Sequence, residues 1–399
     1  MIVTRSFVYI TIADFVVRSA YQMGKTPLLP VFAASLGAGE VMLASIVSVS
    51  VLTGLLFKPL IGILSDRWGR RIWILIGTVF FIIMPFTYRF IQTPEQLLMV
   101  RLIHGLATAI YGPVTLALVS EEGKLHRAER LSWFSLARNS GYVVGPGVAG
   151  WLLLSFDPVS VFTIIGILSS FALVPVMLLK DKSPSISIER QTLMKHAVSA
   201  LIAGGTTPAV WMAGCMEAAI FMAVYAIRTF MPIYALSSGF NLMWIGAFFS
   251  IQEATHIIFN PIGGKLGDRF GYLSVVPLGM LILALSLSLL VQVNTVLPLI
   301  IIATSIGMSQ ALVFPSTIAL VGTQIKEGNV ATGMGLVGTM KNSGKVGGPI
   351  LAGSLIHWLN YPWTFQLMGM VLLVGAISLW ISRWVAYTKD QKKSLISDD

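Results

Sequence analysis

The chain has 399 residues, of which 55% are hydrophobic and 11% are charged, whereas roughly 25% of residues are charged in an average soluble domain. This composition excludes a soluble protein, because a soluble fold of this length could not bury so much apolar surface. The formal net charge of +10 does not indicate nucleic-acid binding, because the lysines and arginines lie in short segments between apolar runs.

Twelve apolar runs follow one another along the chain, and each is long enough to cross a ~30 Å hydrocarbon core as a helix. The first run is too long for a signal peptide and has a counterpart in the second half, so we count it as a span. The sequence therefore predicts an all-α membrane protein with twelve transmembrane helices. The predicted spans are 7–34, 41–64, 72–91, 94–119, 132–155, 159–179, 209–236, 242–266, 273–293, 296–322, 331–357 and 361–386.

The distribution of lysine and arginine predicts the orientation. The segments that follow the second, fourth, sixth, eighth and tenth runs are rich in these residues, and the segments after the odd-numbered runs hold almost none. Because positively charged loops stay in the cytoplasm, we expect a multi-pass protein of the plasma (inner) membrane with both termini cytoplasmic. The long segment 180–208 is then a cytoplasmic linker.

The two halves of the chain repeat one another. The segment Gly62–Arg71 recurs as Gly264–Gly271, and the interval is 202 for the first glycines (264 − 62) and for the aspartates (268 − 66). Glycines and prolines elsewhere recur at the same interval, which indicates a shared pattern of backbone bends.

Around residue 140 the interval becomes 203, and Arg138-Asn-Ser-Gly141 aligns with Lys341-Asn-Ser-Gly344. Internal repeats of this size are typical of secondary transporters, with the binding site between the repeats. We therefore expect two six-helix bundles related by pseudo-two-fold symmetry, at residues 1–179 and 209–399.

These features together resemble the major facilitator superfamily (MFS). The segment Gly62–Arg71 resembles the family's signature between helices 2 and 3, and Arg101 followed by Gly105 resembles its helix 4 motif. The segment Gly141–Gly150 resembles the helix 5 motif of the family's antiporters. The closest resemblance is to the drug:proton antiporter branch, which implies a monomer that moves small molecules and protons across the lipid bilayer by alternating access.

The signature segment contains a candidate gate on the cytoplasmic side. We expect Gly62 and Gly69 to allow close backbone approach, and we expect Asp66 and Arg70 to form a latch with Glu121 or the adjacent Glu122. The alternative is a solvated charged turn that only fixes the topology. The predicted gate residues are Gly62, Asp66, Arg67, Gly69, Arg70 and Glu121.

Helix 5 contains a candidate hinge formed by Gly141, Gly145, Pro146 and Gly150. Glycines four residues apart allow close helix packing, and proline bends a helix. The alternative is ordinary packing of small residues.

Ionisable residues inside the spans are costly in a membrane and usually face a cavity. Asp14, Arg18 and Lys25 share one face of the first span, and Asp14 can pair with Arg18. Proton coupling needs a group that can be emptied and refilled, and the candidates in order are Asp14, Glu217 and Glu253. The alternative is a static ion pair. The predicted substrate-cavity residues are Arg18, Lys25, Arg101, His104, Tyr225, Arg228, His256, Lys341 and Lys345.

Lys58 and Arg138 are expected to reach the headgroups. The acids in the interior of the spans are three, Asp14, Glu217 and Glu253, and the bases there are eight, which suits an anionic or zwitterionic amphiphile. These bases are Arg18, Lys25, Lys58, Arg101, Arg138, Arg228, Lys341 and Lys345. No zinc spacing, phosphate loop or nucleophile elbow occurs, so no enzyme, metal or cofactor is predicted.

Three hypotheses for the function follow. The first is proton-coupled export of drug-like or amphiphilic molecules. The second is a proton-linked or exchange carrier of an organic anion or zwitterionic metabolite. The third, a non-transporting membrane sensor or scaffold, is disfavoured by the intact gate and hinge motifs.

Overall fold

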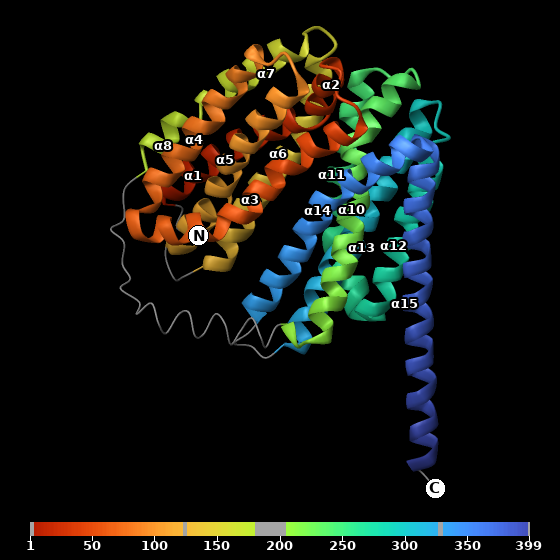
Figure 1. Cartoon of the computed structure of the whole chain (residues 1–399). Coiled ribbons are helices and arrows are strands. Elements are labelled where there is room, and N and C mark those ends of the chain that lie inside the picture. Colours follow the sequence, from red (N-terminus) through yellow and green to blue (C-terminus); the bar gives the residue numbers. More distant parts are fainter. Residues whose placement is uncertain (1–3, 123–125, 180–204, 326–329, 398–399) are drawn as a thin grey trace. The chain divides into compact units, whose positions relative to one another are not determined.

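The computed structural model describes residues 4–122, 126–179, 205–325 and 330–397, and within these ranges every regular element is a helix (Figure 1). Most of the predicted linker, residues 180–204, lies outside the described residues.

Helices of the first half correspond one after another to the first six predicted runs. The first and the sixth run are each divided into two helices, and a 3₁₀ turn extends the third. These elements are α1 (Arg5–Lys25), α2 (Leu28–Ser35), α3 (Glu40–Trp68), α4 (Arg70–Thr87), η1 (Tyr88–Phe90), α5 (Pro94–Glu121), α6 (Arg127–Leu152), α7 (Pro158–Ser170) and α8 (Leu173–Met177).

Helices of the second half are not divided. They correspond to the last six predicted runs. These helices are α10 (Pro208–Ser237), α11 (Leu242–Phe270), α12 (Tyr272–Leu290), α13 (Val296–Gln324), α14 (Val330–Leu359) and α15 (Tyr361–Ser397).

Nine helices in the described part of the chain are long and apolar enough to cross a membrane by length and composition. The three predicted spans outside this set correspond to α1, α6 and α14. Each of the three carries ionisable or polar residues at mid-helix, such as Asp14, Arg138 and Lys341. With these three, the helices account for all twelve predicted runs, so the predicted all-α membrane fold is confirmed.

The chain divides into two compact units. Unit 1 contains Met1–Ile188, Tyr225–Ser250 and Lys345–Trp358, and unit 2 contains Glu189–Val224, Ile251–Gly344 and Leu359–Asp399. Helices α10, α11 and α14 each contribute residues to both units. The bundle boundaries expected from the repeat, 1–179 and 209–399, stay a prediction.

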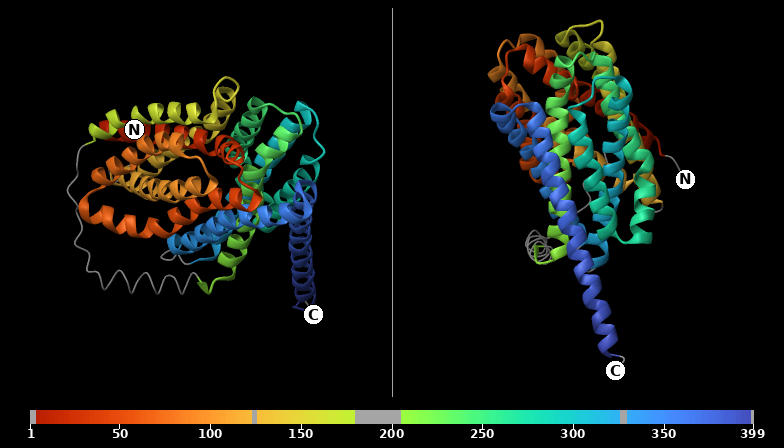
Figure 2. Two further views of the ribbon diagram at one scale, coloured as in Figure 1. Left: turned by 45° about the horizontal axis from the view of Figure 1, so that its top comes forward. Right: turned by 90° about the vertical axis from the view of Figure 1, so that its right-hand side faces the viewer.

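The repeat in sequence is matched by a repeat in helix packing. In unit 1, α4 packs against both α5 and α7, and in unit 2, α12 packs against both α13 and α15 (Figure 2). These are the third, fourth and sixth spans of each half. In the first half α1 also packs along α6, and α3 along α5.

Several helices begin at side chains that accept backbone N–H bonds. Thr93 caps α5, and Asp157 caps α7 by accepting the N–H groups of Val159 and Ser160 at 2.9 and 3.1 Å. The Ser160 hydroxyl also donates to Asp157 at 2.6 Å, and these bonds lower the pKa of the Asp157 carboxyl below its usual value. A proline follows each of these caps, where its missing N–H costs nothing.

Close contact between α1 and α6 depends on two glycines. A Cβ at Gly141 would lie 2.9 Å from the backbone nitrogen of Ser19, and a Cβ at Gly145 would lie 2.7 Å from Cβ of Gln22. In unit 2, a Cβ at Gly344 would likewise collide with the backbone of Ala218. The glycines therefore let neighbouring helix backbones approach closely.

We expect the substitution Gly145→Ala to destabilise the protein by about 1–3 kcal/mol, because the added methyl group forces α1 and α6 apart. Thermal unfolding in mild detergent would measure the loss. The matched control is Gly322→Ala in α13, where a Cβ meets nothing within 4 Å and the change is neutral or stabilising by up to ~1 kcal/mol. Equal shifts for the two variants would contradict the close-packing explanation.

Candidate functional site

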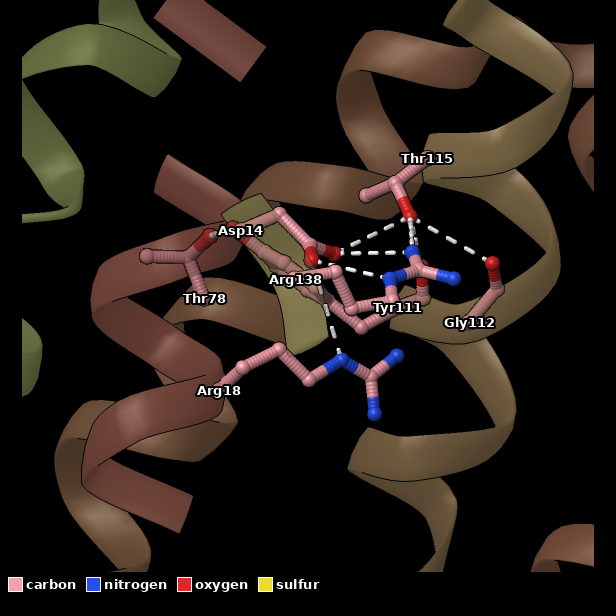
Figure 3. Close-up of polar contacts among 7 residues, drawn as sticks. All are labelled: Asp14, Arg18, Thr78, Tyr111, Gly112, Thr115 and Arg138. Carbon is pink, nitrogen blue, oxygen red and sulfur yellow. Dashed lines mark hydrogen bonds and ion pairs between the residues drawn. The ribbon is translucent and has the colours of Figure 1, made fainter. Parts of the chain in front are cut away.

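The carboxylate of Asp14 lies fully buried in α1 and is bound by an arginine of α6 (Figure 3). Nε and Nη2 of Arg138 donate to its two oxygens at 3.0 and 2.9 Å. This fork-to-fork geometry is the strongest form of carboxylate pairing and fixes both side chains. The ion pair therefore connects α1 to α6 inside unit 1.

Thr115 of α5 joins the pair to a third helix. Its hydroxyl oxygen lies 2.7 Å from Nη2 of Arg138, 3.2 Å from Asp14 and 2.6 Å from the carbonyl of Tyr111 (Figure 3). Since a hydroxyl has one hydrogen, Thr115 accepts from Arg138 and donates to either the carboxylate or its own helix. The site is thus a network of three helices rather than an isolated pair.

Asp14 makes the expected ion pair with Arg18, but Arg138 binds it more closely. Nε of Arg18, the expected partner, lies 3.8 Å from the carboxylate, a longer contact than either bond from Arg138. Arg138 was expected to reach the headgroups, yet its side chain is only 13% exposed and points to Asp14. The alignment of Arg138 with Lys341 in the repeat was the sequence signal that could have identified Arg138 as a partner of Asp14.

The same arrangement occurs in unit 2 around Glu217. The hydroxyl of Thr317 donates to its Oε1 at 2.8 Å, and Nζ of Lys341 lies 3.5 Å from its Oε2. The intervals to the residues of unit 1 are 203 for the acids (217 − 14), 202 for the threonines (317 − 115) and 203 for the bases (341 − 138). Each half thus builds one triad of a carboxylate, a threonine and a base.

The two triads differ in how firmly the base is held. The side chain of Lys341 is 31% exposed and makes one contact with the carboxylate. Its ammonium also lies over the rings of Phe221 and Phe314, at 4.7 and 5.1 Å from their centroids. Arg138 makes two bonds to its carboxylate and is more buried. The Glu217 triad is therefore the looser one.

Arg101 and His104, predicted to line the substrate cavity, lie buried within unit 1. Arg101 donates to the hydroxyls of Ser50 and Tyr88 at 2.6 and 3.4 Å, and Nδ1 of His104 lies 3.5 Å from the Tyr88 hydroxyl. These residues border a small cavity together with Tyr21. The structure brings the two predicted residues together through Tyr88.

Glu253, the third candidate for proton coupling, lies beside His256 on α11. Oε2 of Glu253 and Nδ1 of His256 are 3.6 Å apart, as the spacing of three residues predicts. The neighbouring Gln252 donates to Gln310 at 2.8 Å. Glu253 and His256 both belong to unit 2.

Four further predicted cavity residues meet in unit 1. The ammonium of Lys25 donates to the hydroxyl of Tyr225 at 3.2 Å, and Arg228 and Lys345 lie near the same tyrosine ring. Within the described ranges, no three His, Cys, Asp or Glu side chains lie where they could hold a metal ion.

The gate residues expected to meet do so at the ends of α3, α4 and α5. Nε of Arg70 donates to Glu121 at 2.8 and 2.9 Å, and its Nη2 lies 2.8 Å from Asp66. Glu122, the alternative to Glu121, instead accepts a bond from the Thr4 hydroxyl.

The expectation for Gly62 is wrong, because a Cβ there would meet nothing within 4 Å and no backbone approaches it. Gly69 has a φ of 90°, so its role is to let the chain turn between α3 and α4. Arg67 is exposed.

The predicted hinge residue Gly150 packs against the backbone of Leu242 and Gly246, and Pro146 lies inside α6.

Comparison with known proteins identifies the family. The sequence profile of the Major Facilitator Superfamily matches residues 15–255 and 243–397, so the chain belongs to this superfamily. Multidrug resistance protein 1 of Bacillus subtilis is 24% identical over 366 residues, covering 89% of this chain and 91% of that protein. An uncharacterised MFS-type transporter of Methanocaldococcus jannaschii is 23% identical over 362 residues, covering 88% and 92%.

The fold is also that of solved transporters. A crystal structure of the nucleoside transporter NupG aligns with a TM-score of 0.80 over 94% of this chain and 99% of that one, at 15% sequence identity. This likeness concerns the fold alone. Because the family and these relatives are transporters, the chain is a multi-pass membrane transporter and not an enzyme, and the predicted resemblance is confirmed.

The two triads are expected to contribute unequally to stability. Asp14→Asn leaves Arg138 buried without its counter-charge and should lower the free energy of unfolding by about 3–5 kcal/mol. Glu217→Gln should lower the free energy of unfolding by about 1–2 kcal/mol, because the partly exposed Lys341 keeps its contact with the aromatic rings. Denaturant titration of the purified protein in detergent measures both values. A larger loss for Glu217→Gln would contradict this ranking.

Proposed function

We propose that this MFS protein is a secondary active transporter that works by alternating access and exports drug-like or amphiphilic small molecules in exchange for protons. The observation that carries the proposal is the pair of equivalent triads, Asp14–Thr115–Arg138 and Glu217–Thr317–Lys341. Proton coupling needs a buried carboxyl whose partner can leave when a proton arrives. Each half of this chain supplies one buried carboxyl held by a base, and the two differ in how easily that base can leave.

The contacts favour Glu217 as the carboxyl that carries the proton. To protonate Asp14, the network would have to break two bonds to Arg138, at 3.0 and 2.9 Å, inside a buried site. To protonate Glu217, it has to displace one ammonium at 3.5 Å. This reverses the order expected from the sequence, where Asp14 came first, and gives Asp14 the role of a fixed ion pair.

The relatives support export of drug-like molecules as the direction and cargo. One relative that matches nearly the whole chain is named a multidrug resistance protein. The solved structures with this fold include transporters of nucleosides and peptides, so the fold by itself does not select the cargo.

A second candidate function is a proton-linked or exchange carrier of an organic anion or zwitterionic metabolite. The surplus of bases inside the spans, eight against three acids, favours it. Vesicles with an imposed pH gradient separate the two: transport that depends on the gradient supports proton-coupled export, and exchange only between anions supports the carrier.

The gate and the orientation complete the proposal. Arg70 binds both Asp66 and Glu121 at the ends of three helices, which suits a latch that closes on one side of the membrane. The loops rich in lysine and arginine support a cytoplasmic location for this side and for both termini. The protein then acts as a monomer in the plasma (inner) membrane.

Proton coupling can be tested by ligand-induced proton release. Cationic dyes and aliphatic acids are added to the purified protein in weak buffer with a pH indicator, and we expect release on binding of a transported compound. Glu217→Gln should abolish the release, because it removes the exchangeable proton. Asp14→Asn, compared per folded molecule, should retain it. Release that persists in Glu217→Gln and disappears in Asp14→Asn would restore the order predicted from the sequence.

The latch can be tested by removing one of its carboxylates. Glu121→Gln leaves Asp66 as the one carboxylate bound to Arg70, and we expect turnover to change by about two- to fivefold, which corresponds to the ~0.5–1 kcal/mol of a partly exposed ion pair. Flux is measured in vesicles at equal protein content. Glu95→Gln, an exposed glutamate at the other end of α5, is the control. Unchanged turnover in Glu121→Gln would remove the latch role.

A further inference from the structure

Helices α1, α4, α5 and α7 of unit 1 surround a small cavity. Its volume is about 10 Å³, which is room for roughly one particle of the size of a water molecule. The polar part of its wall includes Tyr21 of α1, Tyr88 of η1, and Arg101 and His104 of α5. The cavity can therefore hold one small polar particle.

Arg101 brings a positive charge to this cavity without a carboxylate to balance it. The residue is 2% exposed, and its Nη2 and Nη1 donate to the hydroxyls of Ser50 and Tyr88 at 2.6 and 3.4 Å. Among the residues that the structure describes, no Asp or Glu lies within ion-pair distance of Arg101, and its Nε has no acceptor. A buried charge of this kind is costly unless a counter-charge joins it.

His104 offers a second unused donor. The Tyr88 hydroxyl accepts a bond from Arg101, so its single hydrogen is available to Nδ1 of His104, which lies 3.5 Å away. The hydrogen of the neutral imidazole is then on Nε2, and this atom is buried without an acceptor in the described part of the chain. Arg101 and His104 thus border one cavity with two N–H groups that need an acceptor.

We propose that this cavity is a binding site for one monatomic anion, such as chloride, which accepts hydrogen bonds from Nε of Arg101 and Nε2 of His104. A water molecule would satisfy the two donors but leave the guanidinium without a counter-charge, whereas a halide ion does both. Lys25, at the end of α1, adds a positive charge nearby, since its Nζ lies 5.9 Å from the centroid of the Tyr21 ring.

The size of the cavity selects the kind of anion. A space for one water-sized particle excludes a carboxylate, a phosphate or a drug-sized molecule. The bound ion is therefore a structural component that joins α1, α5 and η1, and not cargo. The inference does not depend on what the protein transports.

Halide binding is tested on the unmodified protein in detergent. Sodium chloride replaces sodium gluconate at constant ionic strength, so that surface charges are screened equally, and thermal unfolding is recorded at each step. Because a ligand of the folded state stabilises it, we expect the midpoint to rise by about 2–5 °C and then saturate. Bromide should act like chloride. A midpoint that is the same in chloride, bromide and gluconate would mean that the occupant is neutral and would overturn the proposal.

Bromide also locates the site, because its anomalous scattering identifies it in crystals. We expect an anomalous peak within hydrogen-bond distance of Arg101 Nε and His104 Nε2. Saturable stabilisation by bromide with the peak elsewhere in the molecule would overturn the assignment to this cavity.

A glycine in the cavity wall allows the space to be reduced while Arg101 and His104 stay in place. A Cβ at Gly24 would meet Phe162 and Ile165 at 3.6 and 3.7 Å, which are ordinary contacts, so Gly24→Ala should fold. The added methyl group should weaken chloride binding at least about tenfold, because it takes up room that the ion needs.

The matched control is Gly112→Ala in α5, outside the cavity lining, where a Cβ also makes an ordinary contact, at 3.7 Å. This variant should keep the full response to chloride. An equal response in Gly24→Ala and Gly112→Ala would overturn the site.

Arg101→Gln tests the charge itself. Without the guanidinium the cavity has no reason to prefer an anion, so the unfolding midpoint of this variant should not depend on chloride. A saturating chloride response that persists in Arg101→Gln would show that the ion binds to another residue. If Arg101→Gln does not fold, Gly24→Ala and the bromide peak still decide the question.

Discussion

The bidentate pair of Asp14 and Arg138 is the interaction on which the rest of unit 1 depends. Two charges inside a membrane protein are stable only with near-ideal geometry, and this geometry requires α1 and α6 to lie very close together. Gly141 and Gly145 make that possible, since they follow Arg138 by three and seven residues and so lie on the same face of α6. The ion pair of Asp14 and Arg138 therefore depends on the two glycines of α6.

The second half contains the same device with different chemistry. In α14, Lys341 precedes Gly344 by three residues, and Gly344 packs on the backbone beside Glu217, at Ala218. A lysine has a compact charge on a flexible stem, whereas an arginine presents a rigid fork that matches a carboxylate. With arginine at one position and lysine at the equivalent one, the first triad has a bidentate pair and the second a single, longer contact. Equivalent positions in the two halves therefore differ in how tightly the base holds its carboxylate.

Much of the architecture was predictable from the sequence, because apolar runs and charged loops follow directly from the physics of the bilayer. The twelve spans were predicted on this basis. The meeting of Arg70 with Asp66 and Glu121 was predicted from the resemblance of the segment Gly62–Arg71 to the family's signature. The ion pair of Asp14 with Arg18 was predicted from spacing within one helix, but the closer pair with Arg138 was not, because pairs between helices depend on packing. The expected role of Gly62 was wrong for the same reason. Whether a glycine is needed for close helix packing depends on the residues that face it from other helices, and no atom faces Gly62 within 4 Å of a Cβ built there.

The two aromatic rings beneath Lys341 have a consequence for the energy of ion-pair opening. When a buried carboxylate becomes neutral, an ammonium beside it would normally be stranded in a medium that solvates it poorly. The faces of Phe221 and Phe314 are electron-rich and can hold a cation with about 0.5–2 kcal/mol. Lys341 therefore keeps a favourable contact that does not depend on the charge of Glu217, and its ammonium does not need to be hydrated before the ion pair opens.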